Sequence, residues 1–190
     1  MLITKQVEKT TIFNSLDRLK KLDWGDIAYK LMYPDSGQGW TKEQTERAIA
    51  NYLRFLAFKH QYPNVEIVPS EEIDKVWHTH ILDTLKYAAD CQAVFGRFIH
   101  HFPYFGIRGK SDRQNLEAAF VRTQAIFKEY FGVSLDGSSV CIIPSKQPVK
   151  PSVCIIPKSS VCIIPHEDTN SRPRADIDLD SYLATAIEAI

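Results

Sequence analysis

Apolar residues recur at the spacing of an α-helix along most of the first 131 residues, and this periodicity restricts the fold more than any other feature of the sequence. Stripes of this kind occupy residues 5–23, 27–32, 41–62, 70–82, 83–98 and 111–131. Hardly any segment alternates between apolar and polar residues, as a half-buried β-strand would. The sequence therefore predicts an all-α fold, a compact bundle of about five helices.

Residues that favour helix N-termini stand at three of the expected helix starts. Thr41 is followed three residues later by Gln44, and Ser111 is followed in the same way by Gln114. This spacing is typical of the capping box, in which both side chains bond to free backbone N–H groups. Ser70 is a third capping residue, at the start of the helix that carries the first histidines. The sequence predicts a helix beginning after each of them.

The composition changes near residue 132, and this change indicates a boundary. Residues 133–175 are rich in proline and serine and contain no aromatic residue, as is usual for a linker. Residues 176–190 regain helical apolar spacing. We expect a helical domain over residues 1–132, a mostly unstructured linker over 133–175, and a short amphipathic helix over 176–190. That last helix is expected either to dock back on the domain or to bind another chain.

Three copies of Ser-Val-Cys-Ile-Ile-Pro lie in this linker, at residues 139–144, 152–157 and 160–165. Their cysteines lack the close C-x-x-C pairing of zinc sites. One interpretation is the expansion of a short DNA repeat within a tolerated tail. The alternatives are a peptide that is modified after synthesis, and a β-prone segment that pairs with the sheet edge of a partner.

The charge and the apolar runs of the chain exclude several function classes. There are 23 Lys and Arg and 23 Asp and Glu, so the formal net charge is 23 − 23 = 0. A neutral chain has no global field that attracts nucleic acid. No apolar run is long enough for a membrane span, and the first residues lack the apolar core of a secretory signal. We therefore expect a cytoplasmic protein without a nucleic-acid partner.

Four of the six histidines lie within 24 residues, at positions His78, His80, His100 and His101. Histidine is the commonest metal ligand and the usual acid–base group near neutral pH. On a helix, however, His78 and His80 point about 200° apart and cannot bind one ion unless the segment is extended. His80 joins the buried stripe, where Asp83 or Thr84 is expected to bond its ring nitrogens. His78 is expected to face Asp74.

The other two histidines follow a predicted helix. If residues 84–99 formed one straight helix, its ends would lie roughly 22 Å apart, which separates His100 from His80. Only a break at Gly96 would bring His100 back. Because His100 and His101 are adjacent, at most one of them is expected to face a given site.

Three interpretations of this cluster remain open, and one of them is a site for proton transfer or for a ligand. A metal site would use His78 and His80 first, with His100, His101, Asp83 and Cys91 as further candidates. A mixture of imidazole and thiolate ligands favours Zn or Cu. In the third interpretation the histidines belong to a satisfied polar network within the core. Trp77 is then a core anchor and Cys91 is a buried, unreactive thiol.

The run Val76-Trp77-His78-Thr79-His80, followed by Tyr87, Asp90-Cys91, Phe95-Gly96 and His100-His101, resembles the glycine-rich domain-containing protein-like family. That family occurs in plants and bacteria, and the resemblance covers roughly residues 10–131, as in a cyanobacterial-type member. It implies a helical fold and a shared motif, but no reaction. This chain departs from the plant proteins because it has only eight glycines and carries the cysteine repeats in place of a glycine-rich tail.

These observations lead to two hypotheses of different classes. The first is a helical domain, not an enzyme, that binds a protein partner or a small ligand. Its candidate motif residues are Trp77, His78, His80, Asp83, Tyr87, Asp90, Cys91, His100 and His101. The second is a histidine-based metal-binding protein or metalloenzyme, with Zn or Cu as cofactor, which in one variant acts on the cysteines of its own repeats.

Overall fold

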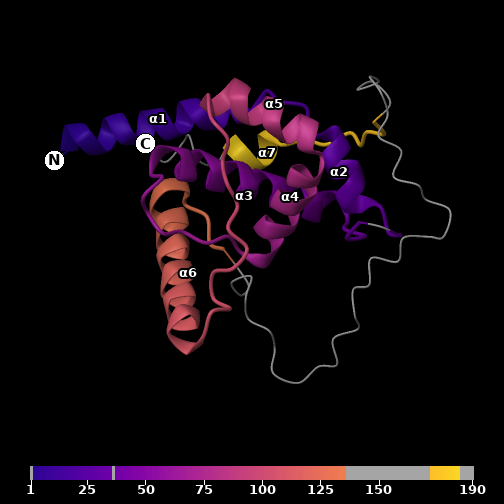
Figure 1. Cartoon of the computed structure of the whole chain (residues 1–190). Coiled ribbons are helices and arrows are strands. Elements are labelled where there is room, and N and C mark those ends of the chain that lie inside the picture. The colour runs from indigo at the N-terminus through magenta and orange to yellow at the C-terminus, as the bar shows by residue number, and fades with distance from the viewer. Residues whose placement is uncertain (1, 36, 136–171, 185–190) are drawn as a thin grey trace.

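The computed structural model describes residues 2–35, 37–135 and 172–184 of the chain (Figure 1). It contains α1 (Leu2–Lys20), α2 (Gly25–Met32), α3 (Lys42–Gln61), α4 (Glu71–Leu82), α5 (Thr84–Phe95), α6 (Lys110–Phe131) and α7 (Asp180–Leu183). No β-strand is present among these residues, so the predicted all-α fold is confirmed. The three cysteine repeats and most of the expected linker lie outside the described residues.

Helix α3 is the centre of the bundle, because it contacts α1, α2, α4 and α7. Its side chains are buried on nearly every face; among them are Ile49, Tyr52, Leu53, Phe55 and Leu56. A helix that is apolar over so much of its circumference is stable only when other helices surround it. The remaining helices therefore pack around α3, with α6 at one side of the bundle (Figure 1).

Two of the three predicted helix starts are confirmed. Thr41 and Gln44 form the capping box at the start of α3, and the Ser70 hydroxyl accepts the Ile73 N–H at 3.3 Å. The prediction for Ser111 is wrong, because α6 begins at Lys110 and no side chain caps it. The carboxylate of Asp112 instead accepts the backbone N–H groups of the preceding loop, which fixes that loop against the first turn of α6.

Helix α5 ends at Phe95, three residues before the predicted end. Gly96 has a φ of 66°, a left-handed conformation that glycine adopts without strain, and its N–H bonds to the carbonyl of Gln92. After this turn, residues 97–109 run without helix back across the bundle to the start of α6 (Figure 1). The helix is therefore broken at Gly96, which is the condition predicted from the sequence for the return of the following histidines toward α4.

The C-terminal segment packs back on the helical domain. Leu179 and Leu183 are buried in the main core, and the Ala175 N–H bonds to the carbonyl of Gly25 at 2.8 Å. Within residues 172–184, however, only the four residues of α7 form an α-helix. A single turn is sufficient to bury these two leucines, whereas the rest of the expected helix, residues 185–190, lies outside the described part of the chain.

Candidate functional site

His80 lies at the centre of a buried hydrogen-bonded network. Its Nδ1 lies 3.0 Å from the hydroxyl of Tyr52 on α3, and its Nε2 lies 3.0 Å from the carboxylate of Asp90 on α5. Asp90 also pairs with the ammonium of Lys86 at 3.0 Å. These partners assign the proton of His80 to Nε2, which donates to Asp90, while Nδ1 accepts the Tyr52 O–H. The network joins three helices across the core.

The electrostatics of this network favour a neutral imidazole. Burial lowers the pKa of His80, although Asp90 opposes this shift. The pKa of Asp90 is also lowered: burial opposes the shift, but the hydrogen bonds from His80 and Lys86 outweigh it. His80 is therefore a satisfied core histidine, as the structural interpretation expects.

The partners predicted for His80 from sequence are wrong. Asp83 ends α4 and caps α5, where its carboxylate accepts the Lys86 N–H and forms two hydrogen bonds with Arg172. Arg172 lies in the C-terminal segment, 89 residues away in the sequence. Local spacing could not reveal that Tyr52 and Asp90, and not Asp83, would bond to the ring of His80.

A second chain of hydrogen bonds fixes the segment that follows Gly96. The indole Nε1 of Trp77 donates to the hydroxyl of Tyr87 at 2.9 Å, and this hydroxyl donates to the carbonyl of Ile99. Trp77 is 4% exposed, which confirms its predicted place in the core. These two hydrogen bonds tie residues 97–101 to both α4 and α5, so they determine where His101 lies.

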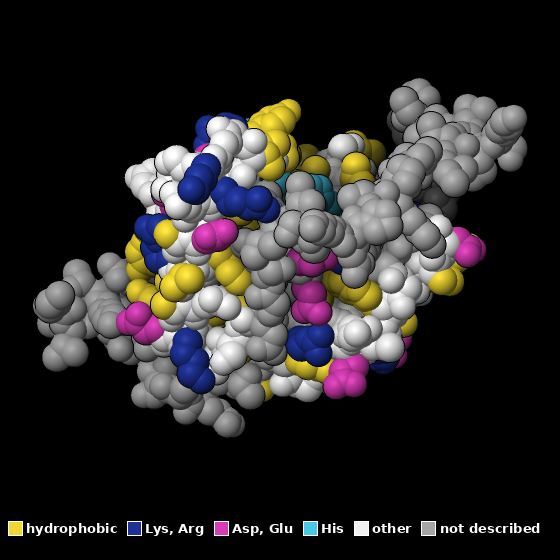
Figure 2. Space-filling model, turned by 90° about the horizontal axis from the view of Figure 1, so that it is seen from below, with side chains coloured by type: hydrophobic (Ala, Val, Ile, Leu, Met, Phe, Trp, Pro, Cys, Tyr) yellow, Lys and Arg dark blue, Asp and Glu magenta, His cyan; other side chains and the backbone are white. Residues whose placement is uncertain are grey.

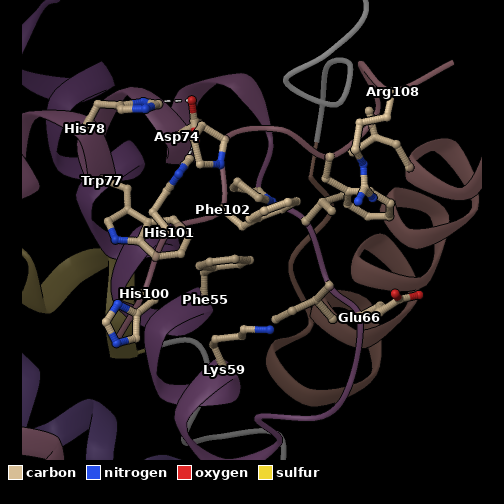
Figure 3. Close-up of a pocket in the computed structure, with 16 residues that line it drawn as sticks. Phe55, Lys59, Glu66, Asp74, Trp77, His78, His100, His101, Phe102 and Arg108 are labelled. Atoms are coloured by element: carbon tan, nitrogen blue, oxygen red, sulfur yellow. Dashed lines mark hydrogen bonds and ion pairs between the residues drawn. The ribbon is translucent and has the colours of Figure 1, made fainter. Parts of the chain in front are cut away.

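Asp74, His78 and His101 meet at one edge of the bundle (Figure 3). His78 Nδ1 lies 2.9 Å from one oxygen of the Asp74 carboxylate, and His101 Nε2 lies 2.8 Å from the other. One donor atom of each residue lies within 4.8 Å of the other two. Asp74 is buried, His101 is half-buried, and His78 is half exposed. We call these three residues the Asp–His cluster.

The sequence explains how the Asp–His cluster forms. Asp74 and His78 are separated by four residues on α4 and share a face, as predicted. The turn at Gly96 then brings back the chain, so that His101 reaches Asp74 from 27 residues away. His80 lies instead in the core network, so the structure separates the two histidines of the His-x-His motif. His100 is exposed and lines the same pocket, but it is not one of the three converging donors.

The Asp–His cluster opens on a pocket of about 300 Å³. Its walls come from α3, the loop before α4, α4 itself, the segment 97–109 and α6. The lining side chains include Phe55, Trp77, Phe102, Phe105 and Leu116 as apolar groups, and Lys59, Glu66 and Arg108 as charged groups. In Figure 2, histidine side chains reach the surface with acidic and hydrophobic side chains nearby. The arrangement provides donors for a metal beside an apolar cavity for a ligand.

Cys91 lies on the buried face of α5 and is 2% exposed. Burial raises the pKa of its thiol, which keeps it protonated and unreactive at neutral pH. We expect iodoacetamide to leave Cys91 unmodified in the native protein and to alkylate it in denaturant, as measured by peptide mass spectrometry. Alkylation of Cys91 at the same rate in both states would contradict this assignment.

Comparisons with known proteins agree with the predicted resemblance. Residues 33–125 match the family described as UCP032817-like. Glycine-rich domain-containing protein 1 of Arabidopsis thaliana is 34% identical over 65 residues, which are 34% of this chain and 8% of that relative. Glycine-rich domain-containing protein 2 of the same plant is 30% identical over 91 residues, which are 46% of this chain and 11% of that relative.

These matches confirm the resemblance to glycine-rich domain-containing proteins, and the family match spans the helices that carry the pocket. The chain corresponds to only about a tenth of the length of these relatives. No solved structure matches it. Within the described residues, no helix combines the length and the apolar character needed to cross a membrane.

Proposed function

We propose that this chain, which is related to the glycine-rich domain-containing proteins, binds one divalent transition-metal ion through Asp74, His78 and His101. The observation that carries this proposal is the convergence of these three donors at the mouth of the pocket. Zn²⁺ is the first candidate. A location in the cytoplasm and a protein or small-molecule partner belong to the same proposal.

The donor set fits such an ion. Two imidazole nitrogens and one carboxylate oxygen are ligands that Zn²⁺ takes at about 2.0–2.2 Å, and three protein ligands leave a fourth position open. The contacts of 2.8 and 2.9 Å hold the three donors close together. Coordination then requires small side-chain movements, and the proton on each of these two ring nitrogens must move to the other ring nitrogen or to solvent. No thiolate belongs to the cluster, so Cu(I), which prefers sulfur, is less suitable than Zn²⁺.

The surroundings hold the donors in place. The edge of the Trp77 ring packs on His101 with 4.5 Å between the ring centroids, and the Trp77–Tyr87–Ile99 hydrogen bonds fix the backbone just before His101. The buried position of Asp74 limits its rotation. Because ligands that are oriented in advance lose little freedom on binding, such support strengthens a metal site.

Isothermal titration of the full chain with ZnCl₂ tests this proposal. The background carries Cys141→Ser, Cys154→Ser and Cys162→Ser, so that the repeat thiols do not bind the ion. We expect one Zn²⁺ per chain, and His101→Ala should weaken binding by about a hundredfold or more, since a ligand is lost. The matched control is His100→Ala, which removes the adjacent imidazole and should leave the affinity unchanged.

Two results would overturn the metal assignment. One is the absence of stoichiometric binding by Zn²⁺, Fe²⁺ or Cu²⁺. The other is equal binding by the parent and the His101→Ala variant. In either case the alternative, a pocket that binds a small ligand or a partner through its apolar walls and the polar edge of the Asp–His cluster, becomes the better account.

A further inference from the structure

We infer that the pocket binds a small organic carboxylate with an aromatic or other compact apolar body, and that Lys59 binds its carboxylate group. This inference goes beyond metal binding, because it concerns the other end of the pocket. Only the effect of the metal on affinity, given below, rests on the proposed function.

Lys59 supplies the pocket with an ammonium group that has few partners. It lies on α3, one turn after Phe55, and its ammonium donates one long hydrogen bond of 3.5 Å to the carbonyl of Val65. Among the described residues, no carboxylate lies within 4.0 Å of this ammonium. The group is half-buried, and burial lowers its pKa, although Glu66 opposes this effect. A half-buried ammonium with so few partners gains free energy when an anion binds.

Arg108, the other strong cation in the lining, is already neutralised. Its guanidinium donates to both oxygens of Asp112, at 3.2 and 2.6 Å, and its Cζ lies 5.4 Å from the ring centroid of Phe102. It therefore serves to position the aromatic wall, and Lys59 remains as the group that recognises charge.

The space between Lys59 and the Asp–His cluster is apolar. Phe55 and Phe102 lie between the two ends of the pocket in Figure 3, and Trp77 lies beside His101. Flat aromatic side chains of this kind favour a flat apolar ligand. A volume of about 300 Å³ is at the lower end of the range for small-molecule pockets, which limits the ligand to a compact acid.

A metal in the Asp–His cluster would change the charge of the pocket. Without a metal, the lining of the pocket contains the carboxylates of Asp74 and Glu66 and the ammonium of Lys59. With a divalent cation bound, the cluster becomes net positive, so both ends of the pocket attract an anion. The metal and the carboxylate should therefore bind with positive coupling, which acts equally in both directions.

NMR titration of the full chain with phenylacetate tests the inference, and phenylacetamide is the uncharged probe of the same shape. We expect phenylacetate to shift the signals of Lys59 and Phe55, and phenylacetamide to bind at least about tenfold more weakly. Lys59→Met keeps the apolar stem and should lose about the same factor. Lys42→Met removes a charge from the far end of the same helix, outside the pocket, and should bind phenylacetate like the parent.

Equal binding of the acid and the amide, or unchanged binding by Lys59→Met, would overturn the inference. The titration is repeated with saturating Zn²⁺, where the affinity for phenylacetate should rise severalfold in the parent but not in His101→Ala. If Zn²⁺ binds and this rise is absent, the coupling is wrong. If Zn²⁺ itself fails to bind, the metal proposal fails, while the Lys59 comparison still decides on the carboxylate.

Discussion

A chain that ends at residue 171 is expected to melt at least about 10 °C below a chain that ends at residue 184. Residues 172–184 bury Leu179 and Leu183 in the main core, together with parts of Ala175, Ile177 and Tyr182. Full burial of a leucine side chain contributes roughly 1.5–3 kcal/mol, so the two leucines account for several kcal/mol. For a domain of this size, each kcal/mol shifts the melting temperature by about 2–8 °C.

Polar contacts of the same segment add to this effect. Arg172 pairs with Asp83, and the Asp178 N–H donates to the carboxylate of Glu46 at 2.7 Å. The buried guanidinium of Arg54 donates to the carbonyl of Tyr182, and burial lowers the pKa of Arg54 to about 10. Removal of the segment therefore leaves a desolvated cation without one of its acceptors, which is costly.

Thermal unfolding followed by circular dichroism measures the difference. The two chains differ only in the described segment, so residues 185–190 do not affect the comparison. Leu183→Ala should reproduce part of the loss, about 2–5 kcal/mol, whereas Asp180→Asn, which breaks only the exposed pair with Lys20, should change little. Melting temperatures within about 2 °C of each other would show that the segment is an appendage.

The helical fold could be predicted from sequence because its signals are local. The 3.6-residue period and the caps at Thr41 and Ser70 depend on neighbours within a few positions, and they are confirmed. The cap at Ser111 failed because Asp112 satisfies the loop before α6 instead. Local patterns therefore identify helices well, but they do not establish which polar side chain, if any, bonds to the free N–H groups at the start of a helix.

The candidate site could be predicted only in part, for the same reason. The pairing of Asp74 with His78 follows from their spacing on one helix. The return of His101 required the turn at Gly96, whose residue type signals a break but not its direction. Tyr52 and Lys59 on α3 gave no local signal, because they meet α4 and the segment 97–109 only once the bundle has formed. Asp74 was missed as a candidate ligand, although a carboxylate four residues before a histidine is a recognisable pattern.

Replacement of His80 by alanine is expected to destabilise the protein by about 2–4 kcal/mol, whereas replacement of His78 should cost less than about 1 kcal/mol. His80 is 1% exposed. Its loss leaves a cavity, and it leaves the buried Tyr52 hydroxyl and the half-buried Asp90 carboxylate without their shared partner. The His78 side chain is 50% exposed, and Asp74 keeps His101 when His78 is removed.

The same pair of variants separates structure from metal binding, since the two histidines are only two residues apart on one helix. Urea unfolding should place His80→Ala well below the parent and His78→Ala close to it, with EDTA present throughout. In separate samples without EDTA, Zn²⁺ should raise the melting temperature of His80→Ala wherever that variant is folded, but not that of His78→Ala. If His78→Ala were stabilised by Zn²⁺ while His80→Ala was not, the ion would be bound at the core network, and the assignment of the two histidines would be reversed.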